Sequence, residues 1–63
     1  MNKELIINAM AASFKEANIK LAVKNGMPED KARQAIEPMS DSILKCMDSV
    51  LETLLENFPE FIK

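Results

Sequence analysis

The sequence predicts an all-α protein, an antiparallel helical hairpin that dimerises into a four-helix-type bundle. Apolar residues recur at intervals of three and four over two long segments, which is the period of an amphipathic helix. One strong turn signal, Asn25-Gly26-Met27-Pro28, separates the two segments. No segment shows the strict apolar–polar alternation of a half-buried β-strand. The chain is therefore expected to form one helical domain spanning residues 1–63.

The first helix is expected from about residue 3 to residue 25, with apolar side chains on two opposite faces. At about 100° per residue, the first stripe contains Ile7, Met10, Phe14, Ala17 and Leu21. The second stripe contains Leu5, Ala12, Ile19 and Val23. A two-helix hairpin covers only one stripe, and apolar residues at helical spacing are typical of a buried surface. We expect the second stripe to mediate self-association, the alternative being scattered exposed side chains.

The hairpin turn is expected at residues 25–28. Gly26 can adopt the left-handed conformation that ends a helix. Pro28 suits the first position of the next helix, because the N–H that proline lacks has no partner there. Glu29 and Asp30 follow in the first turn, where carboxylates interact favourably with the helix dipole. These signals place the second helix antiparallel to the first.

The second helix is expected from about residue 28 to residue 57, with a C-terminal tail at residues 58–63. Its apolar residues keep helical spacing throughout: Ala32, Ile36, Met39, Ile43, Met47, Val50 and Leu54. Pro38 removes one internal hydrogen bond and is expected to kink or break the helix. The unbroken phase of the apolar residues favours a kink near residue 38.

The two helices differ in length, about 33 Å against about 45 Å at ~1.5 Å per residue. The second helix should therefore extend past its neighbour beyond about Asp48, and this overhang is apolar: Val50, Leu51, Leu54, Leu55 and Phe58. Either a second subunit covers it in a four-helix bundle, or the chain breaks at Pro38 and folds back as a three-helix unit. Because both arrangements leave one face of the first helix uncovered, a two-fold homodimer is the expected assembly.

The size and composition of the chain also point to a second subunit. A chain of 63 residues and 7.1 kDa builds only a small core, and such chains usually add disulfides, a metal or another subunit. The single cysteine, Cys46, cannot form an internal disulfide, and the chain has no histidine, the commonest metal ligand. No metal or cofactor is expected. Cys46 is interpreted as a small apolar side chain, the alternative being a cross-link between protomers.

The same composition indicates a non-enzymatic protein without a small-molecule substrate. Histidine, the usual group for proton transfer near neutral pH, is absent, and Cys46 has no adjacent base. A lone thiol and the lack of an apolar leader are typical of a cytoplasmic protein. No run approaches the ~20 apolar residues of a membrane-spanning helix, so no membrane association is expected.

Two surfaces are candidates for binding an outside partner. Four carboxylates lie on one side of the second helix: Asp41, Asp48, Glu52 and Glu56. They form either a solvated outer face or a docking stripe for a basic surface. The tail contains Phe61 and Ile62, which either pack against the bundle or serve as a peptide bound by another protein.

Nucleic acid is a less favoured partner. Phosphate binding needs clustered positive charge, yet Lys15, Lys20 and Lys24 do not share one stripe and Arg33 is the only arginine. A dimer could still bring two sets of lysines together. A dimeric helical RNA- or DNA-binding regulator therefore remains the alternative function.

The whole chain, from MNKELIINAM through NGMPEDKARQAIEPM to LLENFPEFIK, resembles the small helical early proteins encoded in the exo to xis region of lambdoid bacteriophages. Length and overall character carry the resemblance, and no catalytic or ligand-binding motif accompanies it. It implies an early protein that acts in the cytoplasm of the bacterial host on the choice between lytic and lysogenic growth. The expected function is regulation through protein–protein contacts, including contact with a host protein.

Overall fold

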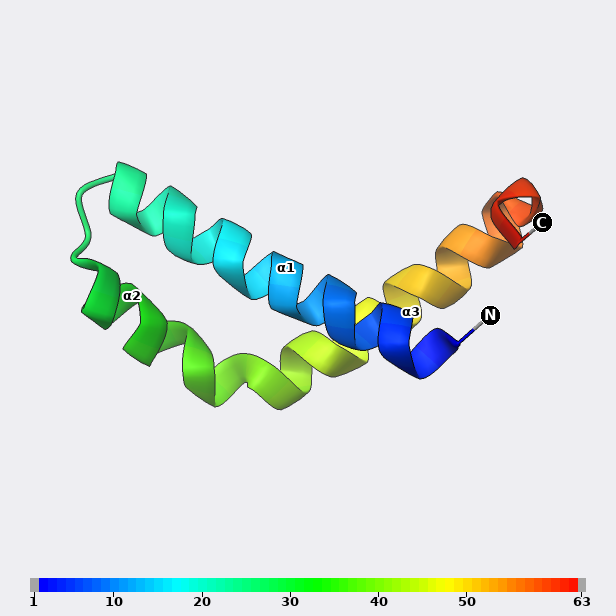
Figure 1. Ribbon diagram of the computed structural model, residues 1–63, viewed down its shortest axis with the longest axis horizontal. Helices are drawn as coiled ribbons and strands as arrows, with labels where there is room; N and C mark the ends of the chain where they lie inside the picture. Colours follow the sequence, from blue (N-terminus) through cyan, green and yellow to red (C-terminus); the bar gives the residue numbers. More distant parts are fainter. Residues whose placement is uncertain (1, 63) are drawn as a thin grey trace.

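The computed structural model describes the backbone of residues 2–62 and the side chains of residues 2–60, and this part of the chain is almost entirely helical (Figure 1). The α-helices are α1 (Lys3–Lys24), α2 (Glu29–Ile36) and α3 (Ser40–Asn57). Two short 3₁₀ helices, η1 (Glu37–Met39) and η2 (Pro59–Ile62), follow α2 and α3. Helix α1 runs antiparallel to α2 and α3. The prediction of an all-α helical hairpin is confirmed.

Helix α1 begins at a side-chain cap. Asn2 has an extended backbone (φ −91°, ψ 94°), and its Oδ1 accepts a hydrogen bond of 3.1 Å from the Leu5 N–H. This bond satisfies one of the N–H groups that the first turn leaves without a partner. Glu4 in the first turn and Lys24 in the last turn both complement the helix dipole.

The turn after α1 has the hydrogen bonds of a Schellman motif. Gly26 has φ of 103°, its N–H donates to the Val23 carbonyl (3.0 Å), and the Met27 N–H donates to the Ala22 carbonyl (3.0 Å). These are the two bonds that end a helix at a left-handed glycine. The turn therefore reverses the chain for a local reason that the sequence already contains.

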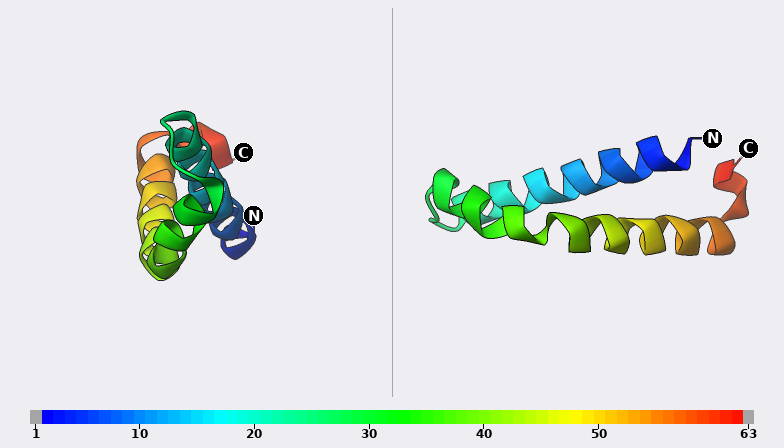
Figure 2. Two further views of the ribbon diagram at one scale, coloured as in Figure 1. Left: turned by 90° about the vertical axis from the view of Figure 1, so that its left-hand side faces the viewer. Right: turned by 90° about the horizontal axis from the view of Figure 1, so that it is seen from below.

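Pro38 lies in the 3₁₀ turn η1, which joins α2 to α3 without reversing the chain. Glu37 and Ser40 keep right-handed helical angles, and the Ser40 Oγ donates to the Glu37 carbonyl (2.9 Å). Figure 1 shows the chain path bending between α2 and α3 at this turn, and the right-hand view of Figure 2 shows both helices running back along α1. The interruption is a local tightening of the helix, and the folded-back three-helix arrangement is not adopted.

Few residues are shielded from solvent, and the chain is elongated. The buried residues are Ala11, Ile19, Ala32, Ile43, Met47 and Leu51, each between 4% and 7% exposed. The radius of gyration is 13.8 Å and the extents are 41 × 20 × 15 Å. A compact domain of this length has a radius of gyration of about 11 Å. The hairpin is thus a layer two helices wide.

Helix α1 packs through the arc between the two stripes that its sequence suggests. Ala11 is buried against Ile43 and Met47 of α3, with Ile7 and Met10 half-buried beside them. The small Ala11 side chain leaves room for the larger residues of α3, which favours this arc over either stripe. Both stripes consequently flank the centre of the contact, with Ile7 and Met10 of the first stripe half-buried and Ile19 of the second stripe buried.

Candidate interaction surfaces

One end of the hairpin carries a network of charged side chains. Arg33 on α2 donates to Glu16 on α1 through Nη1 (2.8 Å to Oε2) and Nη2 (3.3 Å to Oε1). Its Nε also donates to Glu29 Oε2 (3.1 Å), one turn earlier on α2. All three side chains are exposed, so water and salt screen the network. It orients α2 against α1 at the end that contains the turn.

The arginine shifts the ionisation of its partner. The hydrogen bond from Arg33 lowers the pKa of Glu16, with a smaller contribution from its positive charge, while partial desolvation acts the other way. The hydrogen bonds from Arg33 to Glu16 and Glu29 in turn raise the pKa of the guanidinium. Both groups therefore stay charged over the whole neutral range.

A lysine lies within the contact between α1 and the start of α3. Lys15 is half-buried, and its Nζ lies 3.3 Å from the Oγ of Ser40. Because the Ser40 hydroxyl already donates to Glu37, it accepts from the ammonium. This bond links α1 to the residue that follows the Pro38 turn.

The other end of the hairpin presents an uncharged side. The run Leu5–Phe14 contains no charged residue, so three turns of α1 are uncharged in every direction. Helix α3 is also uncharged along one flank, at Cys46, Ser49, Val50, Thr53, Leu54 and Asn57. The charged residues of α3 gather on its opposite flank, at Asp41, Lys45, Asp48, Glu52 and Glu56.

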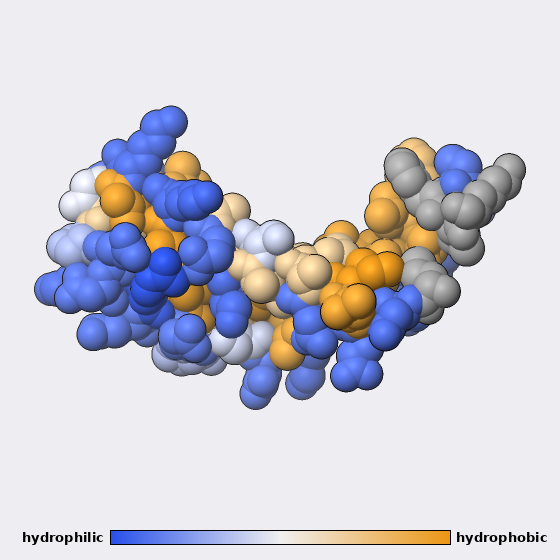
Figure 3. Space-filling view, in the orientation of Figure 1, coloured by the Kyte–Doolittle hydropathy of each residue, from blue (hydrophilic) through white to orange (hydrophobic). Residues whose placement is uncertain are grey.

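The uncharged parts of α1 and α3 lie on the same side of the pair. On α1, Met10 lies one residue before the buried Ala11 and Phe14 lies three residues after it. On α3, Cys46 and Val50 have the same positions relative to the buried Met47. In an antiparallel helix pair, equivalent positions fall on the same side. In Figure 3 the concave upper edge is pale to orange between the two ends, whereas blue side chains line the lower edge.

Two shallow apolar hollows occupy this side. The first, of about 550 Å³, is lined by Ile6, Ala9, Met10, Ser13, Phe14 and Met47. The second, of about 420 Å³, is lined by Cys46, Ser49, Val50, Thr53, Leu54, Asn57 and Phe58. We call these two sets of lining residues together the charge-free face. Its thiol, Cys46, is exposed.

The structure distributes the predicted self-association residues over several places. Ile19 and Leu51 are buried within the single chain, and Leu55 is half-buried. Leu5, Ala12 and Val23 are exposed, and Leu5 lines a small polar hollow with Asn2, Glu4 and Asn8. Val50, Leu54 and Phe58 lie together on the charge-free face. The overhang is shorter than expected, because Lys3 at the start of α1 pairs with Glu52 of α3.

Sequence reasoning by stripes missed the members of the charge-free face on α1 that lie between the stripes, such as Ile6 and Ala9. It also placed Met10 and Phe14 on a different face from the self-association residues. The signal that identifies the region is the absence of charge from Leu5 to Phe14, rather than the spacing of its large side chains.

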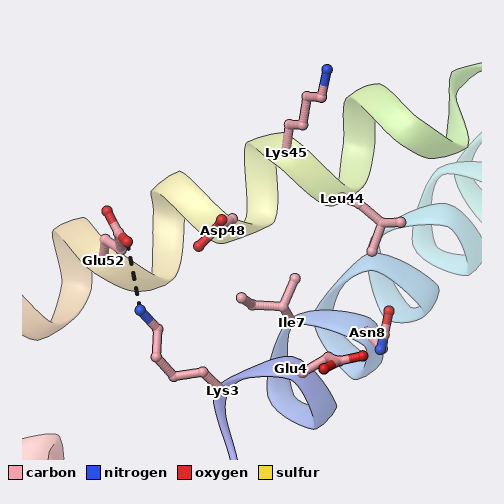
Figure 4. Close-up of a pocket in the computed structure, with 8 residues that line it drawn as sticks. All are labelled: Lys3, Glu4, Ile7, Asn8, Leu44, Lys45, Asp48 and Glu52. Atoms are coloured by element: carbon pink, nitrogen blue, oxygen red, sulfur yellow. Dashed lines mark ion pairs between the residues drawn. The ribbon is translucent and has the colours of Figure 1, made fainter.

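The acidic side of α3 is mixed with basic groups. Lys3, Glu4, Ile7, Asn8, Leu44, Lys45, Asp48 and Glu52 line a hollow of about 510 Å³ (Figure 4). Lys3 Nζ lies 3.5 Å from Glu52 Oε1, and Lys45 projects from α3 about one turn before Asp48. Asp41 and Glu56 are exposed outside this hollow. The side chains of Phe61 and Ile62 lie outside the described residues.

A further apolar hollow, of about 210 Å³, lies between α1 and α2 beside the turn. Its lining includes Ile19, Ala32 and Ile36, and it is bordered by Met27 and Met39, which are 44% and 54% exposed. The methionines partly cover this hollow, and their flexible side chains can adapt to its shape.

Within the described side chains, no group of three or more His, Cys, Asp or Glu residues is placed to hold a metal ion. None of the helices in the described range has the length and apolar character needed to cross a membrane. No family model, curated protein or solved structure matches the chain.

Proposed function

We propose that this chain is a non-enzymatic regulatory protein that acts through protein–protein contacts and works as a homodimer. The observation that carries the proposal is uncovered apolar surface. Among the described side chains, the large apolar residues left exposed are Leu5, Phe14, Leu21, Val23, Met27, Met39, Val50 and Phe58. Apolar surface of this extent marks an interaction site in a small protein.

The exposed area has the size of a protein interface. The accessible surface is 4890 Å², whereas a compact monomer of 7.1 kDa exposes about 4,100 Å². The excess is about 800 Å², and a standard protein–protein interface buries about 800 Å² on each partner. Burial of one standard interface would therefore reduce the accessible surface of this chain to the value expected for a compact monomer of its mass.

The charged surfaces then remain for a second partner. In a dimer that covers the apolar side, the side of α3 with Asp41, Asp48, Glu52 and Glu56 stays in contact with solvent. The resemblance to early proteins of lambdoid phages supports a host protein as this partner and the bacterial cytoplasm as the location. It also supports an effect on the choice between lytic and lysogenic growth.

The placement of the basic side chains gives the nucleic-acid alternative no support. Arg33 is engaged with two carboxylates, and Lys15 is half-buried with its ammonium on Ser40. Lys3 is paired with Glu52. Phosphate binding depends on several basic groups presented together, so we retain the protein-binding role.

Sedimentation equilibrium tests the proposal over a loading range of about 1 to 200 μM, which brackets ordinary micromolar dissociation constants. We expect the mass to approach twice 7.1 kDa within this range. A mass of 7.1 kDa throughout would contradict the homodimer. In that case, the exposed apolar residues would have to bind a different protein.

A further inference from the structure

The concave, uncharged side of the hairpin points to a specific mode of assembly. We infer that a second copy of this chain binds to the charge-free face of the first, in a two-fold arrangement in which both copies use that face. The inference rests on the proposed homodimer and specifies its surface. This surface shares Val50, Leu54 and Phe58 with the self-association residues that the sequence predicts. It excludes the predicted second stripe of α1, which includes the buried Ile19 and the exposed Leu5 and Val23.

Electrostatics favours this face over the others. In a two-fold interface the same patch occurs on both subunits, so a charged patch brings like charges together. The opposite side of the pair carries Asp48 and Glu52, and the turn end carries Glu16, Arg33 and Glu29. Burying those groups would also require their desolvation. The charge-free face carries neither cost.

The pattern of α1 independently requires cover at this place. A helix that is hydrophobic all round is normally buried, and Leu5–Phe14 comes close to this pattern, with Asn8 and Ser13 as its only polar residues. Its own hairpin buries only Ala11 fully there, while Phe14 stays 41% exposed. Of the other residues in these three turns, Ile6, Ala9, Met10, Ser13 and Phe14 lie on the charge-free face, whereas Leu5 and Ala12 lie on the second stripe. A second copy supplies cover of the same apolar character.

The face also has the composition and shape of an interface. Apolar side chains such as Phe14 and Val50 are accompanied by the polar, uncharged groups of Ser13, Ser49 and Thr53. Interfaces of this kind have an apolar centre with hydrogen-bonding groups around it. This side of the molecule is concave along its length (Figure 3). The middle of a second copy that crosses at a large angle can therefore lie between the two ends of the first copy.

Matched lysine substitutions test the inference. Phe14→Lys and Val50→Lys change residues that are 41% and 44% exposed on the charge-free face. Leu5→Lys and Val23→Lys change residues that are 66% and 41% exposed on the second stripe, and they serve as controls. All four introduce the same charge at exposed helical positions. Far-UV circular dichroism establishes that each variant keeps its helix content.

We expect Phe14→Lys and Val50→Lys to raise the dimer dissociation constant at least about tenfold, because each dimer then buries two unpaired ammonium groups. The controls should stay within about threefold of the unmodified chain. If only the controls dissociate the dimer, the inference is overturned while the homodimer stands. If the unmodified chain is monomeric throughout, both the inference and the homodimer are overturned.

Cys46 provides a second readout without any substitution. It is the only cysteine, it is exposed in the single chain, and it lines the charge-free face. The dimer shields the Cys46 thiol in this arrangement. Its rate of reaction with a soluble aromatic disulfide should therefore fall about tenfold as the fraction of chains in dimers rises to about nine-tenths. The Val50→Lys variant should react rapidly at every concentration. An unchanged rate across a range in which the mass doubles would overturn the inference.

Discussion

The guanidinium of Arg33 and the carboxylate of Glu16 face each other in a two-bond contact, with Nη1–Oε2 and Nη2–Oε1 distances of 2.8 and 3.3 Å. The two residues belong to different helices, so the contact fixes α2 on α1 near the turn. Paired hydrogen bonds between a guanidinium and a carboxylate are stronger and more directional than a single charged contact.

Replacing this arginine should make stability depend on pH in a defined way. The pKa of Glu16 is lowered in the folded chain, so its stabilising effect is present at neutral pH and is lost as pH falls through the folded pKa. We expect Arg33→Gln to lower the melting temperature at pH 7 and to have little effect once Glu16 is protonated. Carboxyl NMR titration should show the pKa of Glu16 rising in this variant.

Lys31→Gln is the matched control for this measurement. It removes the same charge from α2 and leaves the contact between Arg33 and Glu16 in place. It should leave the pKa of Glu16 close to that of the unmodified chain. An equal rise in both variants would show that general charge, rather than the hydrogen bonds, lowers the pKa.

The turn should be sensitive to the conformation of residue 26. Gly26→Ala should lower the free energy of unfolding by about 1–2 kcal/mol, because φ of 103° is unfavourable for alanine. Outside Gly26 and its two neighbours in the chain, no atom lies within 4 Å of the position that a Cβ would occupy, so the cost is one of backbone conformation. Gly26→Asn should cost less, since asparagine tolerates this region better. Urea unfolding of both variants measures the difference.

The helix cap at Asn2 gives an independent prediction for the opposite end. Asn2→Ala should lower the free energy of unfolding by about 1 kcal/mol, because the Leu5 N–H loses its acceptor. Asn2→Asp should retain the cap and add a favourable charge at the helix N-terminus. Thermal unfolding by circular dichroism compares the two. Equal losses in both variants would contradict a capping role.

A substitution of Ile19 distinguishes a role in folding from a role in dimer formation. The stripe pattern of the sequence assigns it to the dimer surface, whereas in the structure it is 5% exposed within a single chain. Ile19→Glu should therefore reduce the helix content at every protein concentration, because it buries an unpaired carboxylate in the hairpin. A fully helical monomeric variant, detected by circular dichroism and sedimentation, would return Ile19 to the dimer surface.

The local features of the fold could be predicted from the sequence because neighbouring residues determine them. The Asn25-Gly26-Met27-Pro28 turn and the antiparallel helices follow from backbone preferences alone. The rotation of α1 about its axis could not be predicted in this way. It depends on the small Ala11 meeting Ile43 and Met47 across the chain, a tertiary contact that the spacing of large side chains does not reveal.

Residue spacing also could not predict which surface of α1 and α3 stays uncovered. The spacing of large apolar residues predicts two stripes, but the uncovered surface also includes Ala9, Ser13 and Ser49, which are small or polar. These residues contribute through the absence of charge. The distribution of charged residues along α1, rather than its apolar spacing, is therefore the sequence signal that distinguishes the segment Leu5–Phe14.

The separation of the charged network at the turn from the charge-free face means that dissolved ions act on these two regions in different ways. A screening salt such as sodium chloride weakens the exposed Arg33 contacts at the turn. Sulfate or phosphate strengthens apolar burial because these ions are excluded from protein surfaces. The identity of the anion, beyond its ionic strength, should thus decide whether added salt loosens the turn end of the hairpin or tightens contacts on its charge-free face.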